Sequence, residues 1–126
     1  MSIIAMTACA HVRRPLDGTA WKLVEWSVSS QHAAATGITA KFSNDRISGS
    51  SGVNSYDGPC KAAADGAFSV GPLQSTEMAG PEPAMRAEGA YMTLLGQASS
   101  YTMTGGKLTL YGKGGNESLI FEPEER

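Results

Sequence analysis

The chain has 126 residues and a formal net charge of −2, with 41% hydrophobic, 7% aromatic and 17% charged residues. This length and composition are typical of one globular domain with one hydrophobic core. The longest basic run is Arg13-Arg14, so the clustered positive charge that neutralises phosphates is missing and nucleic-acid binding is disfavoured. No apolar stretch reaches the roughly 20 residues of a membrane-spanning helix.

Residues 1–15 begin with a short apolar segment that ends in small residues before Cys9. This arrangement is similar to the end of a bacterial lipoprotein signal, in which the cysteine is lipidated. A complete signal has roughly 15–30 residues and a positively charged start. Here the segment is shorter, has no early positive charge, and carries Met6 where leucine is usual. We interpret residues 1–15 as a signal remnant, with Cys9 as the lipidation candidate, or as a flexible tether.

The first strand is predicted from about Thr19 to Ser27 by alternating apolar and polar residues. This pattern places Trp21 and Leu23 on one face and Trp26 on the opposite face. An exposed Trp26 would mark a contact surface. Residues 28–36 are rich in Ser, Ala and Thr and are predicted to form a loop.

Two further hairpin strands follow, joined by a turn at Asn44-Asp45. The apolar residues that share one face of the first of them are Ile38, Ala40 and Phe42. The return strand covers residues 46–49. Residues 49–58 contain three glycines and little apolar content, which predicts a structured loop or a bulged strand end.

The next segments are a short strand around Phe68 and Val70, a further candidate strand over 73–78, and a helix. Pro81-Glu82-Pro83 suits a first helical turn, and the helix is expected to end near Gly96. Its apolar stripe is Ala84, Ala87, Tyr91, Leu94, Leu95 and Ala98. Gly89 costs helix stability, so we expect it to allow close packing on the sheet.

Three short strands are predicted after the helix, and Gly105-Gly106 gives a hairpin signal between the first two. Their apolar residues are Tyr101, Met103, Leu108, Leu110, Leu119 and Phe121. Consecutive hairpins with one helix predict an α+β protein: a small, strongly curved antiparallel β-sheet or barrel with one helix packed on it. The domain is expected to cover residues 16–123, with 124–126 as a tail.

Residue types with catalytic potential form no recognisable motif. His11 lies in the N-terminal segment and His32 in a Ser/Ala loop, and both are interpreted as surface histidines. The acidic candidates are assigned to turns, caps and helix faces: Asp45, Asp57, Asp65, Glu77 and Glu88. Cys60 is interpreted as a small strand residue rather than a reactive thiol. We therefore predict no catalytic, cofactor-binding or metal-binding residues and no cofactor.

Four segments of the sequence resemble the META domain, also called the HslJ-like family. They are Leu16–Leu23, Ile47–Gly58, Gly71–Pro81 with the following helix that carries Met85 and Glu88, and the pair Leu108–Leu110 and Leu119–Phe121. Together they span residues 16–122. The resemblance implies a small antiparallel barrel with a helix, found in bacterial proteins that are often envelope-attached lipoproteins, some of them linked to heat or antibiotic stress. It implies no defined reaction. The fold is also similar to that of secretin-pilot lipoproteins, whose barrel holds lipid.

The sequence departs from the family at two positions. Members often have a cysteine in the central motif and another before the helix, where this chain has Val53 and Gly80. Their joint loss is expected if the two thiols contact each other in relatives, and it puts any thiol role in doubt here.

The family motif supplies the candidate site residues: Gly49, Gly52, Asn54, Tyr56, Gly58 and Thr76. Two interpretations of Asn54 stay open, a side chain that fixes the loop and an amide that contacts a ligand. Tyr56 is expected to be buried with its hydroxyl bonded to the same loop. Thr76 is expected to act similarly from the neighbouring strand.

Three hypotheses for function follow. The first is a non-catalytic envelope domain tethered at Cys9, a stress-tolerance or interaction module with an unknown protein partner. The second is a pilot-like barrel lipoprotein that binds lipid or a small ligand, and the third and least favoured is an enzyme. We expect a monomer that reaches the membrane only through a lipid anchor, and no nucleic-acid partner. A hollow interior would favour the second hypothesis and a filled core the first.

Overall fold

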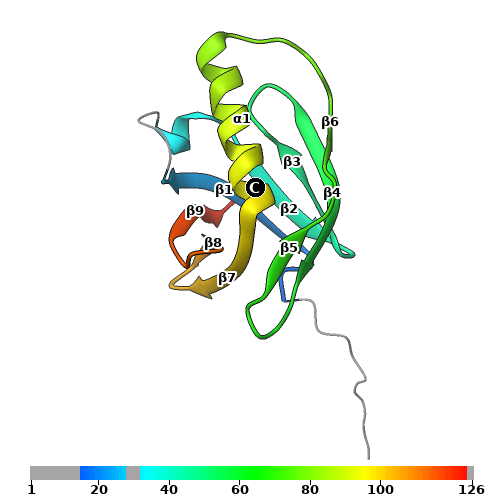
Figure 1. The fold of residues 1–126 in the computed structure, drawn as a ribbon, viewed down its shortest axis with the longest axis vertical. Coiled ribbons are helices and arrows are strands. Elements are labelled where there is room, and N and C mark those ends of the chain that lie inside the picture. The colour runs from blue at the N-terminus through cyan, green and yellow to red at the C-terminus, as the bar shows by residue number, and fades with distance from the viewer. Residues whose placement is uncertain (1–14, 28–31, 125–126) are drawn as a thin grey trace, which may run out of the picture.

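The computed structural model describes residues 15–27 and 32–124. Within these ranges the chain forms nine strands, one α-helix and one short 3-10 helix (Figure 1). The strands are β1 (Thr19–Trp26), β2 (Thr39–Ser43), β3 (Arg46–Ser50), β4 (Ser55–Ala62), β5 (Phe68–Val70), β6 (Gln74–Ser75), β7 (Ala98–Thr104), β8 (Lys107–Gly112) and β9 (Glu117–Pro123). The helices are η2 (Ala33–Ala35) and α1 (Glu82–Gln97).

The strands follow one another around a nearly closed antiparallel barrel in the order β5-β4-β3-β2-β1-β9-β8-β7, and β6 pairs with β4 beside β5. The two end strands meet where Ala67 bridges Ser100 and the Tyr101 amide donates to the Gly66 carbonyl at 2.9 Å. The Tyr101 hydroxyl donates to the Ala63 carbonyl at 2.7 Å. Helix α1 lies against the barrel (Figure 1). The predicted α+β fold, a curved antiparallel barrel with one helix, is confirmed.

Aromatic rings and aliphatic side chains fill the interior of the described domain. Four ring pairs meet edge to face with centroids 5.5 to 6.5 Å apart: Phe42–Phe68, Tyr56–Tyr91, Phe68–Tyr101 and Tyr91–Phe121. This spacing is favourable for aromatic pairs. Tyr91 and Leu95 extend from α1 into this core and are 0% exposed. The helix therefore supplies side chains that occupy the middle of the barrel.

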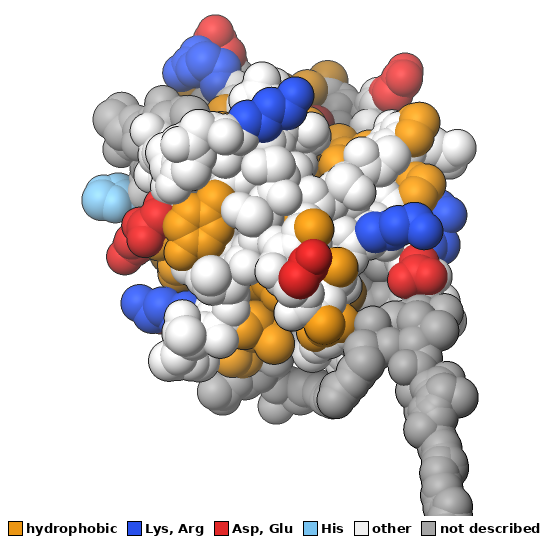
Figure 2. Space-filling view, turned by 60° about the horizontal axis from the view of Figure 1, so that its bottom comes forward, with side chains coloured by type: hydrophobic (Ala, Val, Ile, Leu, Met, Phe, Trp, Pro, Cys, Tyr) orange, Lys and Arg blue, Asp and Glu red, His pale blue; other side chains and the backbone are white. Residues whose placement is uncertain are grey.

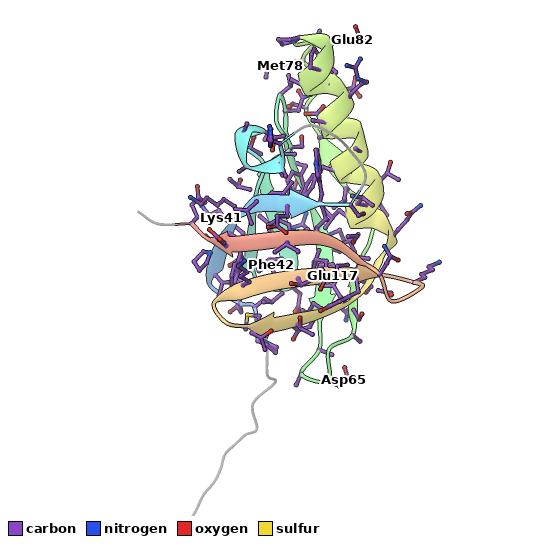
Figure 3. The ribbon with its side chains drawn as sticks, turned by 90° about the vertical axis from the view of Figure 1, so that its left-hand side faces the viewer. Lys41, Phe42, Asp65, Met78, Glu82 and Glu117 are labelled. Atoms are coloured by element: carbon purple, nitrogen blue, oxygen red, sulfur yellow. The ribbon has the colours of Figure 1, made fainter. Side chains whose placement is uncertain are left out.

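Alternation along the strands is as predicted over most of the sheet. Trp21 and Leu23 are both buried on one face of β1. On β2, Phe42 is buried in the core while its neighbour Lys41 is exposed (Figure 3). These positions show which face of β1 and which face of β2 is turned toward the interior.

A β-bulge in β1 corrects the predicted position of Trp26. Leu23 pairs with Phe121 and Trp26 with Leu119, so three steps along β1 match two along β9. The extra residue reverses the side-chain alternation. Trp26 is consequently half-buried and packs against the core rather than lying exposed on the opposite face.

Strand β4 corrects the prediction for residues 49–58. Only residues 51–54 lie outside strands, and β4 begins at Ser55 and pairs with β3 over Arg46–Ser50. Gly58 and Pro59 lie within β4, and both residue types are unfavourable inside strands, which concealed the strand in the sequence. The candidate strand over 73–78 is shorter than predicted, since β6 covers only Gln74–Ser75.

Helix α1 begins at Glu82 and ends at Gln97, close to the predicted limits. Its buried residues are Ala87, Tyr91 and Leu95. Gly89 is exposed, and a Cβ added there would have no neighbour within 4 Å. The prediction that Gly89 allows close packing is therefore wrong. No helix among the described residues has the length and apolar character needed to cross a membrane.

Replacing Gly89 by alanine should raise the free energy of unfolding by roughly 1 kcal/mol, because alanine loses less conformational entropy in a helix. Urea unfolding followed by circular dichroism measures the change. Gly49→Ala is the matched control and should destabilise the protein, since its Cβ would lie 2.3 Å from the Thr39 carbonyl oxygen. A lower midpoint for Gly89→Ala would show that α1 needs the glycine.

Candidate functional site

The family-motif residues gather around the loop 51–54, which joins β3 to β4 and lies against α1 (Figure 1). Ser51 and Asn54 are buried, with 0% and 4% of their surface exposed. The Ser51 amide donates to the Asn54 carbonyl at 2.8 Å, which closes the loop. Polar side chains inside such a tight loop need partners, because an unpaired buried polar group costs about 1–3 kcal/mol.

Glu88 of α1 supplies those partners. Its Oε1 atom accepts hydrogen bonds from the Ser51 hydroxyl at 2.8 Å, the Val53 amide at 3.2 Å and the Asn54 amide at 2.8 Å. Its Oε2 atom accepts from the Asn54 side-chain amide at 2.8 Å. Burial opposes the charged form, but the hydrogen bonds from Asn54, Ser51 and Val53 outweigh it and lower the pKa of Glu88. The carboxylate thus ties the helix to the loop.

The Asn54 side chain connects this loop to the segment after β6. Its Oδ1 atom accepts from the Thr76 hydroxyl at 2.8 Å and from the Met78 amide at 2.7 Å. Its Nδ2 atom donates to Glu88 Oε2 and, at 3.2 Å, to the Met78 carbonyl. An amide side chain has two donors and accepts two bonds, so its capacity is used within the protein. This geometry supports the loop-fixing interpretation of Asn54.

Thr76 has the role expected of it, since its hydroxyl also accepts a bond from the Ser55 amide at 3.2 Å. Tyr56 is buried as expected, but its hydroxyl does not bond to the motif loop. It donates instead to the Thr39 carbonyl on β2 at 2.8 Å and lies 2.6 Å from the Tyr91 hydroxyl of α1. Burial raises the pKa of both phenols, so they act as neutral hydrogen-bonding groups.

At each motif glycine there is a physical reason why a residue with a side chain would be unfavourable. At Gly49 a Cβ would lie 2.3 Å from the Thr39 carbonyl oxygen, and at Gly58 it would lie 2.7 Å from the Pro72 carbonyl oxygen. Neighbouring backbone therefore excludes a side chain at both positions. Gly52 has a φ of +118°, which L-residues with side chains rarely adopt. The glycines allow close chain packing and a tight loop.

Val53 and Gly80, which replace the two frequent family cysteines, are neighbours. A Cβ built on Gly80 would lie 3.5 Å from the Val53 Cβ and 2.8 Å from its Cγ2. The valine side chain therefore fills the space beside the glycine. The loop and the segment before α1 are held together here by packing.

The residues with catalytic potential do not converge in the described part of the chain. His32 lines a surface hollow of about 400 Å³ whose other lining residues are Ala35, Thr36, Gly52, Ala84 and Ala87. Asp57 forms an ion pair with Arg46 at 2.6 Å, and Asp65 caps its own turn through the Ala67 amide at 3.0 Å. Among the described residues, no three His, Cys, Asp or Glu side chains are arranged to hold a metal ion.

Cys60 lies on β4 with 4% of its surface exposed. Burial, assisted by the negative charge of Asp45, raises the pKa of its thiol to about 12. Since the thiolate is the nucleophile, we expect this thiol to react slowly at neutral pH. Cys9, the lipidation candidate, lies outside the described residues.

In a Cys9→Ser variant, the folded protein should react with a thiol reagent such as DTNB at pH 8 at least about a hundredfold more slowly than the urea-unfolded protein, because both access and thiolate are lost on folding. Absorbance at saturating reagent measures the two rates. Equal rates would show that Cys60 is accessible and reactive in the fold.

The site residues selected from the sequence omit several partners of the motif, among them Ser51 and Glu88. A signal for Glu88 is present, because it follows Ala87 and lies three residues before Tyr91, at the edge of the apolar helix stripe. A carboxylate at such a position needs a polar partner in another part of the fold. The partners themselves lie 34 to 37 residues earlier in the chain, where no local pattern indicates them.

The fold and the loop define a small antiparallel barrel whose helix is fixed to the loop 51–54 by the hydrogen bonds of Glu88. The META domain family model matches residues 14–125, and the chain belongs to this family. A protein from Burkholderia xenovorans, solved by NMR, is 30% identical with a TM-score of 0.69, covering 88% of this chain and 85% of that one. A DUF4847 family protein from Bacteroides vulgatus shares the fold at 12% identity and a TM-score of 0.63, covering 89% and 96%. No curated protein matches the sequence.

Proposed function

We propose that this META domain is a non-catalytic interaction module of the bacterial cell envelope, tethered at Cys9, that contributes to stress tolerance through protein contacts. The observation that carries the proposal is the filled interior. Tyr56, Tyr91 and Phe121 occupy the barrel centre with 3%, 0% and 0% of their surfaces exposed. Function is therefore assigned to the outer surface.

The polar motif supports the same proposal. Glu88 accepts hydrogen bonds from the backbone and side-chain amides of Asn54, and the Asn54 side chain also donates to the Met78 carbonyl. The Asn54 side chain therefore has no spare donor for a ligand. Their role is to hold the outer surface in one shape. On the face shown in Figure 2, Lys and Arg side chains are scattered and several lie near acidic ones, in keeping with a protein partner rather than a nucleic acid.

The alternative is a pilot-like barrel that binds lipid or a small ligand. Titrating the folded protein with N-phenyl-1-naphthylamine, a dye that fluoresces in apolar sites, separates the two. We expect no saturable one-to-one increase in fluorescence, because the space that a ligand would need is occupied by rings. A saturable signal that a fatty acid displaces would favour the lipid-binding barrel.

The tether is tested by fractionation of cells that express the natural gene from its own start. The wild-type protein should incorporate labelled palmitate and sediment with membranes, whereas Cys9→Ser should do neither. Cys60→Ser is the matched control and should behave like the wild type, since that thiol is buried in β4. Membrane association of Cys9→Ser, or an unlabelled wild type, would contradict the proposed anchor.

A further inference from the structure

The outer edge of Gln74–Ala79, hereafter the 74–79 edge, presents backbone groups of Ser75 and Glu77 that have no partner among the described residues. Residues 74 and 75 form β6, which pairs with β4 through Tyr56–Ser75 and Asp57–Gln74. The Thr76 amide continues this ladder by donating to the Ser55 carbonyl at 3.1 Å. Among the described residues, no strand pairs with β6 on its other side. In Figure 1, β6 lies at the outer margin of the sheet.

The hydrogen-bonding phase shows which groups point outward. In an antiparallel ladder the residues alternate between pairs that exchange hydrogen bonds and pairs that do not. Because Thr76 bonds to β4, the amide and carbonyl of Ser75 point away from β4. The Met78 amide and carbonyl point inward to the Asn54 side chain, at 2.7 and 3.2 Å, so the backbone of Glu77 also points outward. Ser75 and Glu77 thus present outward groups two residues apart, with no partner in the part of the chain that the structure describes.

This edge is ordered before any partner arrives. Residues 76–79 lie outside helices and strands. The Asn54 side chain nevertheless bonds to both the amide and the carbonyl of Met78 and to the hydroxyl of Thr76. All six residues of the edge are exposed, and Met78, which lies near the start of α1, is 59% exposed (Figure 3). An edge fixed in this way loses little conformational entropy when another strand adds to it.

We propose that the 74–79 edge is a strand-addition site that accepts an extended segment of a partner protein, with a basic residue of that segment opposite Glu77. This inference deepens the proposed function, on which it rests, by naming the surface and the kind of partner. Glu77 is the charged residue of the edge. Pairing of two copies centred on Glu77 would place two carboxylates opposite each other, which is unfavourable. A segment with a lysine or arginine there gains a cross-strand ion pair.

The test uses the peptide acetyl-Val-Thr-Val-Lys-Val-Thr-Val-amide as the probe, titrated into nitrogen-15-labelled protein and followed by NMR. We expect amide shifts confined to residues 73–79, with slowed exchange of the Ser75 and Glu77 amides. A peptide with glutamate in place of the central lysine should bind about fivefold more weakly. Glu77→Lys should reverse this preference. Shifts that are absent at millimolar peptide, or that centre elsewhere, would overturn the proposal.

Two proline variants control for folding. Ser75→Pro removes an amide that points outward, so it should abolish peptide binding and keep the ladder to β4. Thr76→Pro removes the amide that bonds to Ser55 and should lower the unfolding midpoint. If Ser75→Pro is folded and binds as well as the wild type, strand addition is wrong. The naphthylamine titration and the fractionation test the proposed function separately from the strand-addition site. Either proposal can therefore fail while the other holds.

Discussion

Replacing Trp21 by alanine should lower the free energy of unfolding by about 3–5 kcal/mol, the usual cost of truncating a large aromatic core residue. Trp21 is 6% exposed and belongs to the core cluster. Its indole N–H donates to the Thr19 hydroxyl at 2.8 Å, so the substitution removes a hydrogen bond as well as packing. Urea unfolding followed by circular dichroism measures the change, because Trp26 remains and complicates fluorescence.

Lys22→Ala is the matched control on the same strand. Lys22 is exposed on the other face of β1, and substitutions at such positions usually change stability by less than about 0.5 kcal/mol. A Trp21→Ala variant as stable as Lys22→Ala would show that the assigned facing of β1 is wrong.

The double variant Val53→Cys/Gly80→Cys should form a disulfide and raise the free energy of unfolding by about 3 kcal/mol, within the usual range for a closed loop of this size. A Cβ on Gly80 would lie 3.5 Å from the Val53 Cβ, and disulfides have Cβ atoms about 3.5–4.5 Å apart. Replacing valine also removes the Cγ2 atom that would otherwise lie 2.8 Å away. Mass spectrometry of the oxidised protein and urea unfolding with and without reductant measure both effects.

The single variant Gly80→Cys separates bonding from crowding. With Val53 retained, its new Cβ meets the valine side chain, so it should be less stable than the wild type. Cys9→Ser is introduced throughout to leave Cys60 as the remaining native thiol. Failure of the double variant to oxidise would contradict the close approach of the loop to the segment before α1.

The fold could be predicted from the sequence because strands and helix leave periodic patterns. Alternation identified the core face of β2 at Ala40 and Phe42, and the proline-led start and apolar stripe identified α1. Two of the errors arose where a local feature broke the period. The bulge after Leu23 turned Trp26 toward the core, and Gly58-Pro59 concealed β4.

The residues of the candidate site could be predicted from the sequence, but their hydrogen-bond partners could be predicted only in part. Asn54 and Thr76 were identified together, and the structure brings them to 2.8 Å. The carboxylate that joins them to the helix was not assigned this role, because Glu88 and its partners are brought together by tertiary packing and not by local spacing. Likewise, Tyr56 bonds to Tyr91, 35 residues away, and not to its own loop.

The family motif fixes the loop 51–54 to the rest of the fold rather than binding a ligand. A denaturant titration of Asn54→Ala beside the wild type tests this role most directly. The substitution leaves Glu88, Thr76 and Met78 each short of a hydrogen-bond partner. Unfolding free energy should fall by about 1–3 kcal/mol. Ser69→Ala, at an exposed position on β5, should leave the midpoint unchanged. A midpoint for Asn54→Ala equal to that of the wild type would contradict the structural account and favour the interpretation of Asn54 as a ligand-contacting amide.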